Sequence, residues 1–125
     1  MVAPSPIEEA LKAAPIISQV CMVGDGRKYL SALITLSEAK LEEAKSMKNV
    51  GQGLTLNIPT LLEEVRVYVD ELNGSLASYE RIKKFAVLSK EFSIADGEMT
   101  PTLKMKRSVI EIRYREVIEE LYKGA

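Results

Sequence analysis

The pattern of hydrophobic and polar positions predicts three short β-strands in this chain. The segments 16–23, 29–36 and 82–88 are rich in apolar and β-branched residues, as strands are. In the second segment every other residue from Leu30 to Leu36 is apolar, so one face of that strand is expected to be buried. Gly24-Asp25-Gly26 is a turn sequence between the first two segments, which are therefore expected to form an antiparallel hairpin.

A spacing of three and four residues between apolar positions predicts helices in three further segments. The clearest helix runs from about 60 to 76, with fraying expected at Asn73-Gly74. Other helices are predicted at 37–48 and 107–123. The buried stripes of the three helices are Leu62, Val65, Val69, Leu72 and Leu76, then Leu41, Ala44 and Met47, and then Ile110, Tyr114, Val117 and Leu121.

The N-terminal segment has the signature of a helix start. Ser5 is placed to cap a helix, Pro6 suits the first helical position, and Glu8 completes a capping box. Pro15 ends this helix. Its inward face is formed by Ile7, Ala10, Leu11 and Ala14.

Two segments are expected to lie outside the regular elements. Residues 49–59 contain Gly51 and Gly53 and are predicted to form a loop. Residues 92–99 are predicted to form a small hairpin that turns at Asp96-Gly97, a strong turn dipeptide.

The order of these elements predicts an α+β domain. We expect a small, mostly antiparallel sheet of about three strands plus a hairpin, covered by helices. The chain has 125 residues, which is enough for one domain with its own hydrophobic core. No repeat or low-complexity tract divides it, so residues 1–125 are expected to form a single domain.

Composition and charge narrow the functional classes. Hydrophobic residues make up 46% of the chain and charged residues 28%, a balance typical of globular domains. The net charge is −1, so no overall charge favours nucleic acid or a membrane surface as a partner. No apolar run approaches the roughly 20 residues that span a bilayer, and no signal peptide is evident. A cytoplasmic location is expected.

Histidine is absent from the sequence, which removes the commonest metal ligand and general base. A zinc site or a Ser-His-Asp triad within the chain is therefore excluded, and no metal site is expected.

The single cysteine, Cys21, lies in a predicted strand and is expected to be a buried, inert thiol. Residues 24–28 (GDGRK) lack the spacing of a phosphate-binding loop and lead into a strand, so they are interpreted as a turn. The stripe of the 60–76 helix is interpreted as core rather than as a partner-binding seam.

Residues 80–107 concentrate positive charge, with seven basic residues against four acidic ones. Lys104, Lys106 and Arg107 lie near the predicted start of the last helix, where each cation opposes the helix dipole by roughly 0.3–1 kcal/mol. Basic residues held there combine with free backbone N–H groups to bind an anion such as a phosphate or carboxylate. The alternative is a solvated loop without a ligand. The residues alone leave both interpretations open.

Several motifs resemble the C-terminal domain of the adenylate-forming enzymes, in the long-chain fatty acyl-CoA synthetase branch. These are VAPSPIEEALK (2–12), VGDGRKYLSALI (23–34), and ERIKKFAVL (80–88) followed by EMTPTLKMKR (98–107). The resemblance covers nearly the whole chain. Most of the superfamily has Gly-Lys in the last motif, whereas Leu103-Lys104 here is similar to the long-chain branch.

The resemblance implies that Lys104 is the catalytic lysine of acyl-adenylate formation, which contacts the substrate carboxylate and the α-phosphate of ATP. It implies that Lys106 and Arg107 face phosphates of the nucleotide or of coenzyme A. It also implies that the domain is a mobile lid, which rotates for thioester formation with coenzyme A. ATP, Mg²⁺ and coenzyme A would bind the full-length enzyme, and none would bind this domain alone.

The partner implied by the resemblance is a large N-terminal adenylation domain, with fatty acid, ATP and coenzyme A at the interface between the two. We expect Met1 to be a cloning start, and the isolated domain to be inactive. Two alternatives stay open. The chain could be the lid of a fatty acyl-AMP ligase, or a stand-alone α+β interaction module whose basic loop binds an acidic partner. The acyl chain length, the oligomeric state and any membrane association of the parent are left open.

Overall fold

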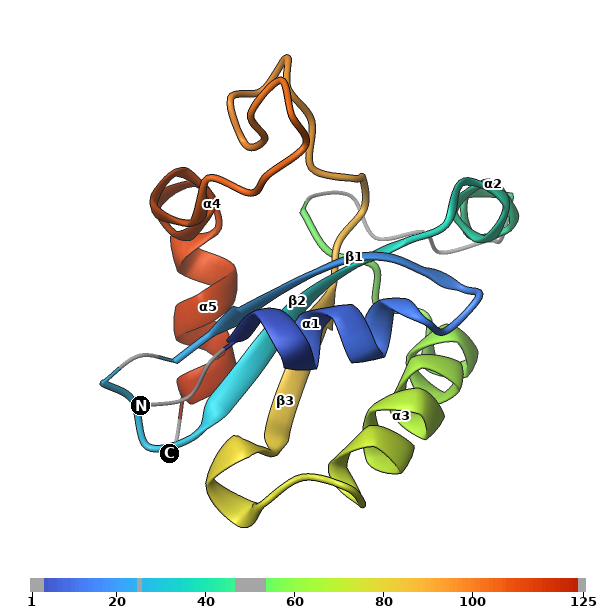
Figure 1. Ribbon diagram of the computed structural model, residues 1–125. Helices are drawn as coiled ribbons and strands as arrows, with labels where there is room; N and C mark the ends of the chain where they lie inside the picture. The colour runs from blue at the N-terminus through green and yellow to red at the C-terminus, as the bar shows by residue number, and fades with distance from the viewer. Residues whose placement is uncertain (1–3, 25, 47–53, 124–125) are drawn as a thin grey trace.

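A three-stranded sheet forms the centre of the computed structural model, which describes residues 4–24, 26–46 and 54–123 (Figure 1). The side chains of Pro4 and Ser5 are not among the described parts. The elements are α1 (Pro4–Lys12), β1 (Ile17–Val23), β2 (Leu30–Leu36), α2 (Glu38–Lys45), α3 (Pro59–Asn73), a short 3-10 helix (Ser78–Glu80), β3 (Ile82–Val87), α4 (Arg107–Arg113) and α5 (Arg115–Tyr122).

The strands lie in the order β1-β2-β3, with β2 in the middle. β1 and β2 pair as the predicted antiparallel hairpin, with Val20 opposite Ile34. β3 pairs with β2 in parallel, with Ala32 opposite Phe85. The α+β class is thus confirmed, and the sheet is mixed. The parallel pairing follows from α2 and α3, which lie between β2 and β3 in the chain. These helices return the chain to the end of the sheet at which β2 begins, so β3 runs in the same direction as β2.

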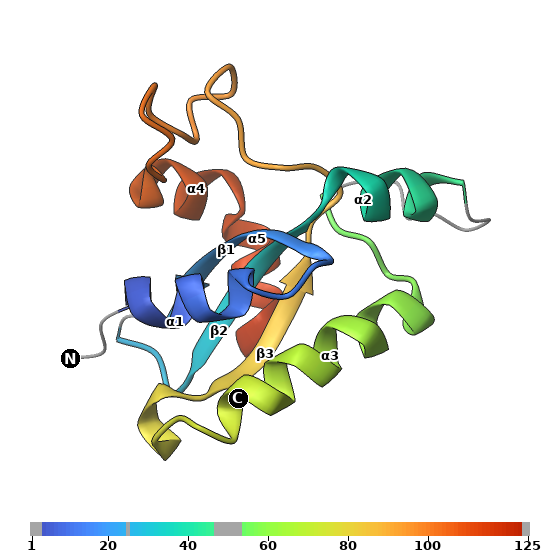
Figure 2. The same ribbon diagram turned by 45° about the vertical axis from the view of Figure 1, so that its right-hand side comes forward.

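Two hydrophobic clusters lie on the two faces of the sheet. Ala32, Ile34 and Leu36 of β2 belong to one cluster, as their alternation predicted, and Leu33 belongs to the other. The first cluster is covered by α1 and α3, and the second by α4 and α5 (Figures 1 and 2). The apolar stripes of the helices, including the stripe of α3, are therefore part of the hydrophobic core.

The last predicted helix is divided in the structure. α4 ends at Arg113, α5 begins at Arg115, and Tyr114 between them leaves the helical conformation, with φ −104° and ψ 23°. Tyr114 is 1% exposed and packs edge-on against Phe92, so the break turns a buried ring into the second cluster. The predicted stripe shifts accordingly, because Ile118 and Tyr122 are buried while Val117 and Leu121 are partly exposed.

The first helix begins at Pro4, one residue before the predicted cap. Glu8 does not act in the predicted capping box: it is 3% exposed, and its carboxylate accepts a hydrogen bond from the backbone N–H of Met22 on β1. The buried face of α1 includes Ile7 and Leu11, whereas Ala10 is exposed.

The middle of the chain largely follows the prediction. α3 ends at Asn73, where fraying was expected, and α2 is capped by the Ser37 hydroxyl, which accepts from the Lys40 N–H. Pro59 is the first residue of α3 rather than the end of the preceding loop. The predicted inward position of Met47 and residues 49–53 of the predicted 49–59 loop lie outside the described residues, as does Asp25 of the turn.

Candidate functional site

A tight hairpin carries Lys104. The only described ladder contact in this part of the chain is an antiparallel bridge between Met99 and Met105. The Leu103 N–H donates to the Thr100 carbonyl, and the Thr100 N–H donates to the Lys104 carbonyl, each at 2.8 Å. Pro101 thus occupies the second position of a β-turn, where a fixed φ is favourable. The hairpin projects beyond α4 and away from the sheet (Figures 1 and 2).

The hairpin predicted for 92–99 was misplaced. Residues 94–97 do turn, and Gly97 has a φ of +74°, but no strand pair flanks that turn among the described residues. The strand-like contacts lie further along the chain, between Met99 and Met105 and between Thr100 and Lys104. Asp96-Gly97 instead closes a turn in which the Asp96 carboxylate accepts from the Ser93 hydroxyl at 2.9 Å.

Leu103 has a left-handed backbone conformation, with a φ of +64°. A turn followed by a left-handed residue is a common hairpin connection, and the left-handed position usually holds glycine. Leucine at this position costs roughly 1 kcal/mol of backbone strain. Its side chain is also 69% exposed. The sequence gives no local signal for this conformation, because leucine is not a turn residue.

Threonine hydroxyls fix the inside of the hairpin. The Thr100 hydroxyl accepts from the Lys104 N–H at 3.0 Å and lies 3.0 Å from the Thr102 hydroxyl. The backbone at Lys104 is therefore held at both its N–H and its carbonyl. Its side chain is exposed, and within the described ranges no carboxylate pairs with its ammonium group.

Glu98 anchors the first strand of the hairpin. Its side chain is fully buried, and one carboxylate oxygen accepts from the Ser93 N–H at 3.1 Å. The other oxygen lies 3.4 Å from Nε of Arg113 on α4. Its backbone carbonyl accepts from the Lys106 N–H, which closes the base of the hairpin. Burial and the nearby Glu98 charge raise the pKa of Tyr114 to about 12.

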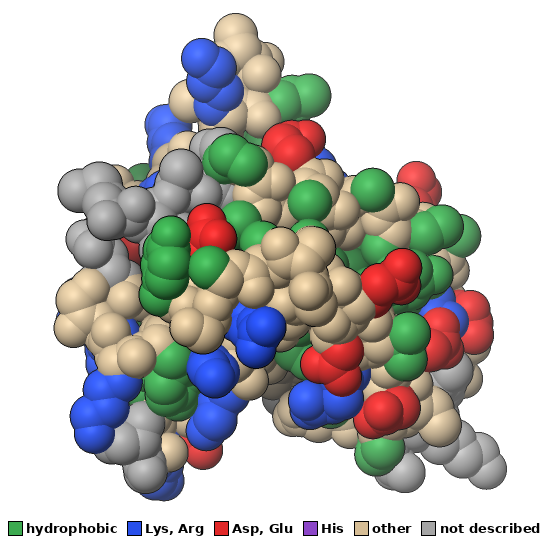
Figure 3. Space-filling model, turned by 60° about the horizontal axis from the view of Figure 1, so that its bottom comes forward, with side chains coloured by type: hydrophobic (Ala, Val, Ile, Leu, Met, Phe, Trp, Pro, Cys, Tyr) green, Lys and Arg blue, Asp and Glu red, His purple; other side chains and the backbone are tan. Residues whose placement is uncertain are grey.

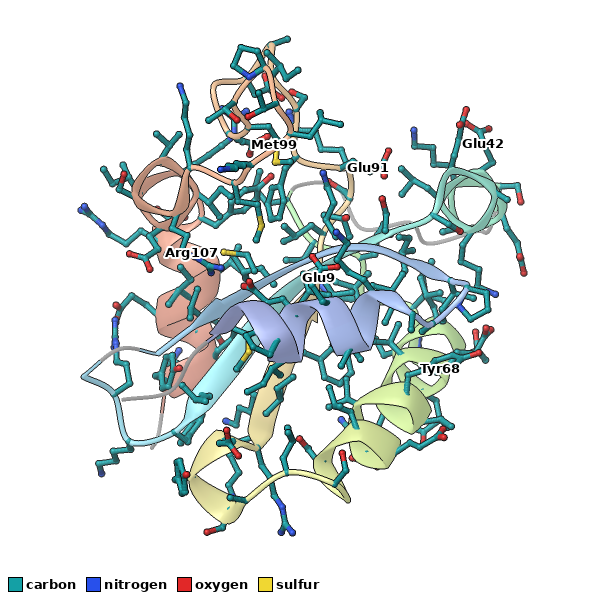
Figure 4. All side chains as sticks on the ribbon, viewed as in Figure 1. Glu9, Glu42, Tyr68, Glu91, Met99 and Arg107 are labelled. Carbon is teal, nitrogen blue, oxygen red and sulfur yellow. The ribbon has the colours of Figure 1, made fainter. Side chains whose placement is uncertain are left out.

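Arg107 anchors the second strand from the other side. Its guanidinium forms a bidentate ion pair with the Glu8 carboxylate, with Nη1 2.7 Å from Oε2. Figure 4 shows Arg107 between the C-terminal helices and β1, with Met99 under the projecting hairpin. Glu8 raises the pKa of Arg107, chiefly through this hydrogen bond. The structure thus gives Arg107 an internal partner, while Lys106 is exposed.

Cys21 lies under this ion pair and is fully buried, as predicted. Arg107 Nη1 is 3.8 Å from its sulfur. Burial nevertheless dominates and raises the pKa of the thiol to about 12, so it is protonated at neutral pH. The thiol is therefore a packing group rather than a nucleophile.

A groove of about 590 Å³, which the sequence analysis did not anticipate, lies between residues 24 and 26–30, residues 78–81 and the start of α4. Its arginines already have partners in the protein: Arg27 pairs with Glu119, and Arg81 donates to the carbonyls of Asn73 and Leu76. On the face shown in Figure 3, Lys and Arg gather at the left and centre while most Asp and Glu lie at the right. Lys104 does not line this groove.

Among the described residues, no three Asp, Glu or Cys side chains gather into a group that could hold a metal ion. None of the described helices is both long enough and apolar enough to cross a membrane.

Comparison with known proteins identifies the family. The family model of the AMP-binding enzyme C-terminal domain matches residues 1–125. The chain belongs to this family. The adenylate-forming resemblance of the sequence is thereby confirmed.

Its relatives within known proteins include long-chain-fatty-acid–CoA ligases. The chain is 34% identical over 125 residues to FadD15 of Mycobacterium tuberculosis, covering 97% of this chain and 21% of the relative. It is 32% identical over 145 residues to ACSBG2 of Gallus gallus, covering 99% of this chain and 19% of the relative. The chain thus spans about a fifth of the length of these relatives.

Among solved structures, the adenylation domain of a carboxylate reductase from Mycobacterium chelonae has a similar fold. The TM-score is 0.77 at 25% identity, and the match covers 97% of this chain and 18% of that one. In both comparisons the matched region makes up about a fifth of a longer protein.

Proposed function

We propose that this chain is the mobile C-terminal lid of an ATP-dependent long-chain fatty acid–CoA ligase, and that Lys104 supplies the positive charge for acyl-adenylate formation. The carrying observation is the Lys104 hairpin: an exposed ammonium on a backbone fixed by Thr100 and anchored at its base. The family membership and the long-chain ligase relatives support the class of reaction.

The chemistry needs a cation and no proton transfer from this chain. A carboxylate oxygen attacks the α-phosphorus of ATP, an acyl–adenylate bond forms, and pyrophosphate leaves. Two anions approach each other in that step, so a positioned ammonium lowers the energy of the transition state. Lys104 is suited to this role because its charge is exposed and is not compensated by a carboxylate among the described residues.

The remaining parts of the reaction belong to a large N-terminal domain in this proposal. That domain would bind ATP, Mg²⁺ and the fatty acid. The lid would then rotate to present another face while coenzyme A attacks the acyl-adenylate, in the way that lids commonly gate catalysis. It stays a prediction that Lys106 and Arg107 face phosphates of the nucleotide or of coenzyme A. Lys106 is the better placed, because Arg107 already binds Glu8.

The test is Lys104→Ala in the full-length protein, with the two half-reactions measured separately. Adenylate formation from fatty acid and ATP should fall by about 10²–10³-fold, as when one oxyanion-type donor is removed. Thioester formation from preformed acyl-adenylate and coenzyme A should be largely kept. Lys83→Ala is the matched control, because Lys83 is an exposed lysine on β3, outside the hairpin. Unchanged adenylate formation in Lys104→Ala would contradict the proposal.

A second candidate is an adenylate-forming enzyme that passes its product to a carrier protein or reductase rather than to coenzyme A. The similarity to a carboxylate reductase adenylation domain favours it. The lid chemistry at Lys104 would be the same in both. Acceptor profiling decides between them, because only a ligase of the first kind releases acyl-CoA when coenzyme A is the sole thiol.

A further inference from the structure

Leu103 combines two unfavourable features at one exposed position. Its backbone is left-handed, and its apolar side chain is 69% exposed. The other left-handed positions among the described residues are Gly24, Gly26 and Gly97. The chain thus uses glycine at each of those positions and a large aliphatic side chain only beside Lys104.

The hairpin itself does not require the leucine side chain. The hydrogen bonds that shape the turn come from backbone groups and from the Thr100 hydroxyl. Glycine at position 103 would allow the same φ without strain. Ile112 is nearly as exposed, so exposure alone does not set Leu103 apart; its positive φ does, and backbone strain that the turn does not need indicates a role outside the fold of this domain.

We propose that Leu103 is a docking residue, whose side chain enters an apolar socket on the large N-terminal domain when Lys104 reaches the reacting groups. This rests on the proposed function. A large N-terminal domain is proposed as the partner because this chain spans only about a fifth of the length of its curated relatives. Leu103 directly precedes Lys104 on a backbone held by hydrogen bonds, so seating the leucine would place the lysine.

The proposal predicts which substitutions matter in the full-length protein. Leu103→Gly and Leu103→Asn both suit a left-handed backbone and both remove the apolar side chain. Each should lower kcat/KM of adenylate formation by roughly ten-fold or more, the effect of losing one buried aliphatic contact. Leu103→Met keeps an apolar side chain and should stay within about three-fold of the parent. Thioester formation from preformed acyl-adenylate should be unchanged in all three, because the lid then presents another face.

The controls separate docking from other roles. If only Leu103→Gly loses activity, loosening of the hairpin is the cause and docking is contradicted. If the loss grows with the acyl chain length of the substrate and appears in KM for the fatty acid, Leu103 contacts the acyl chain, which also overturns the proposal. Lys104→Ala is measured in parallel. If Lys104→Ala loses adenylate formation and the Leu103 variants do not, only the docking proposal is refuted. If Lys104→Ala keeps full activity, the proposed function is refuted.

Discussion

Arg107 and Glu8 join the two ends of the domain through a bidentate ion pair. Glu8 lies on α1, and Arg107 begins α4 immediately after the lysine hairpin. The Glu8 side chain is 4% exposed and that of Arg107 is 34% exposed, so the two partners differ in their access to water. This asymmetry has a measurable consequence.

Arg107→Met should destabilise the domain more than Glu8→Gln. Loss of Arg107 leaves a buried carboxylate with the Met22 N–H as its remaining hydrogen bond, which should lower the free energy of unfolding by about 3 kcal/mol. Glu8→Gln leaves an arginine that water can reach, and should cost only about 1–2 kcal/mol. Urea unfolding of the 125-residue chain measures both.

The matched control for the ion pair is Arg27→Met, because Arg27 and Glu119 form a pair with side chains 37% and 56% exposed. Its cost should be much smaller than that of Arg107→Met, as is usual for surface pairs. Equal effects of Arg107→Met and Arg27→Met would show that burial of Glu8 does not matter.

Gly24→Ala should be far more damaging than Gly26→Ala. Both glycines have positive φ, +125° and +76°. A Cβ on Gly24 would lie 2.5 Å from the Tyr122 hydroxyl and 2.7 Å from the Tyr29 carbonyl, whereas nothing lies within 4 Å of one on Gly26. We expect a loss of about 1 kcal/mol for Gly26→Ala, from backbone strain alone, and a loss of several kcal/mol for Gly24→Ala.

Thermal and urea midpoints check this prediction. The Tyr122 hydroxyl donates to the Tyr29 carbonyl at 2.8 Å, so a Gly24→Ala/Tyr122→Phe double variant should recover part of the loss. The recovery is measured against Tyr122→Phe alone. No recovery would mean that the Tyr29 carbonyl contact or the backbone conformation at Gly24, rather than the Tyr122 contact, sets the cost.

Cys21 should resist thiol reagents in the folded domain. Burial raises the pKa of its thiol from 9.0 to about 12 and also blocks access. Iodoacetamide labelling should therefore be slow at pH 7 and should not accelerate near pH 9, as labelling of an exposed thiol would. The rate should rise with urea and follow the fraction of unfolded chain. Rapid labelling without denaturant would contradict the buried position.

The same pKa shift predicts alkaline sensitivity. A pKa that is higher in the folded state favours folding fully below about pH 9, and this contribution is lost as pH rises toward 12. The stability advantage of the parent over Cys21→Ala should therefore shrink above pH 9. The buried tyrosines titrate in both proteins, so their effect cancels in the difference.

The ionised Asp96 side chain should stabilise the fold at neutral pH and lose this effect in acid. The hydrogen bond from Lys90, and next that from Ser93, lower its pKa below the ordinary 3.8. A lowered pKa in the folded state favours folding above about pH 4, and this is lost as pH falls through the folded value. The difference in urea midpoint between the parent and Asp96→Asn should thus shrink as the pH falls below about 4. Asp70→Asn, at an exposed site on α3, is the control.

Local patterns predicted most of the secondary structure. Short apolar segments identified the three strands, alternation identified the buried face of β2, and helical spacing identified α2 and α3. These features depend on near neighbours in the sequence. The parallel pairing of β3 with β2 depends on how the intervening helices cross the sheet, which no single segment specifies.

The candidate site was predicted only in part. Lys104 and Lys106 were identified from charge and resemblance, and the structure places both exposed. The Glu8 contact of Arg107 could not be foreseen, because its partner lies 99 residues away. The hairpin was misplaced because Asp96-Gly97 is a strong turn signal, whereas the left-handed residue of the real hairpin is a leucine.

The span of the Glu8–Arg107 pair has a consequence for the order of folding. The hairpin of β1 and β2 is local and can form early, whereas a contact across 99 residues has to wait until most of the chain is ordered. The second anchor of the lysine hairpin therefore comes into place only when the first and the fourth helix have met. A chain that is still emerging from the ribosome, or one cut short before Arg107, would carry Lys104 without the geometry for which we propose a function.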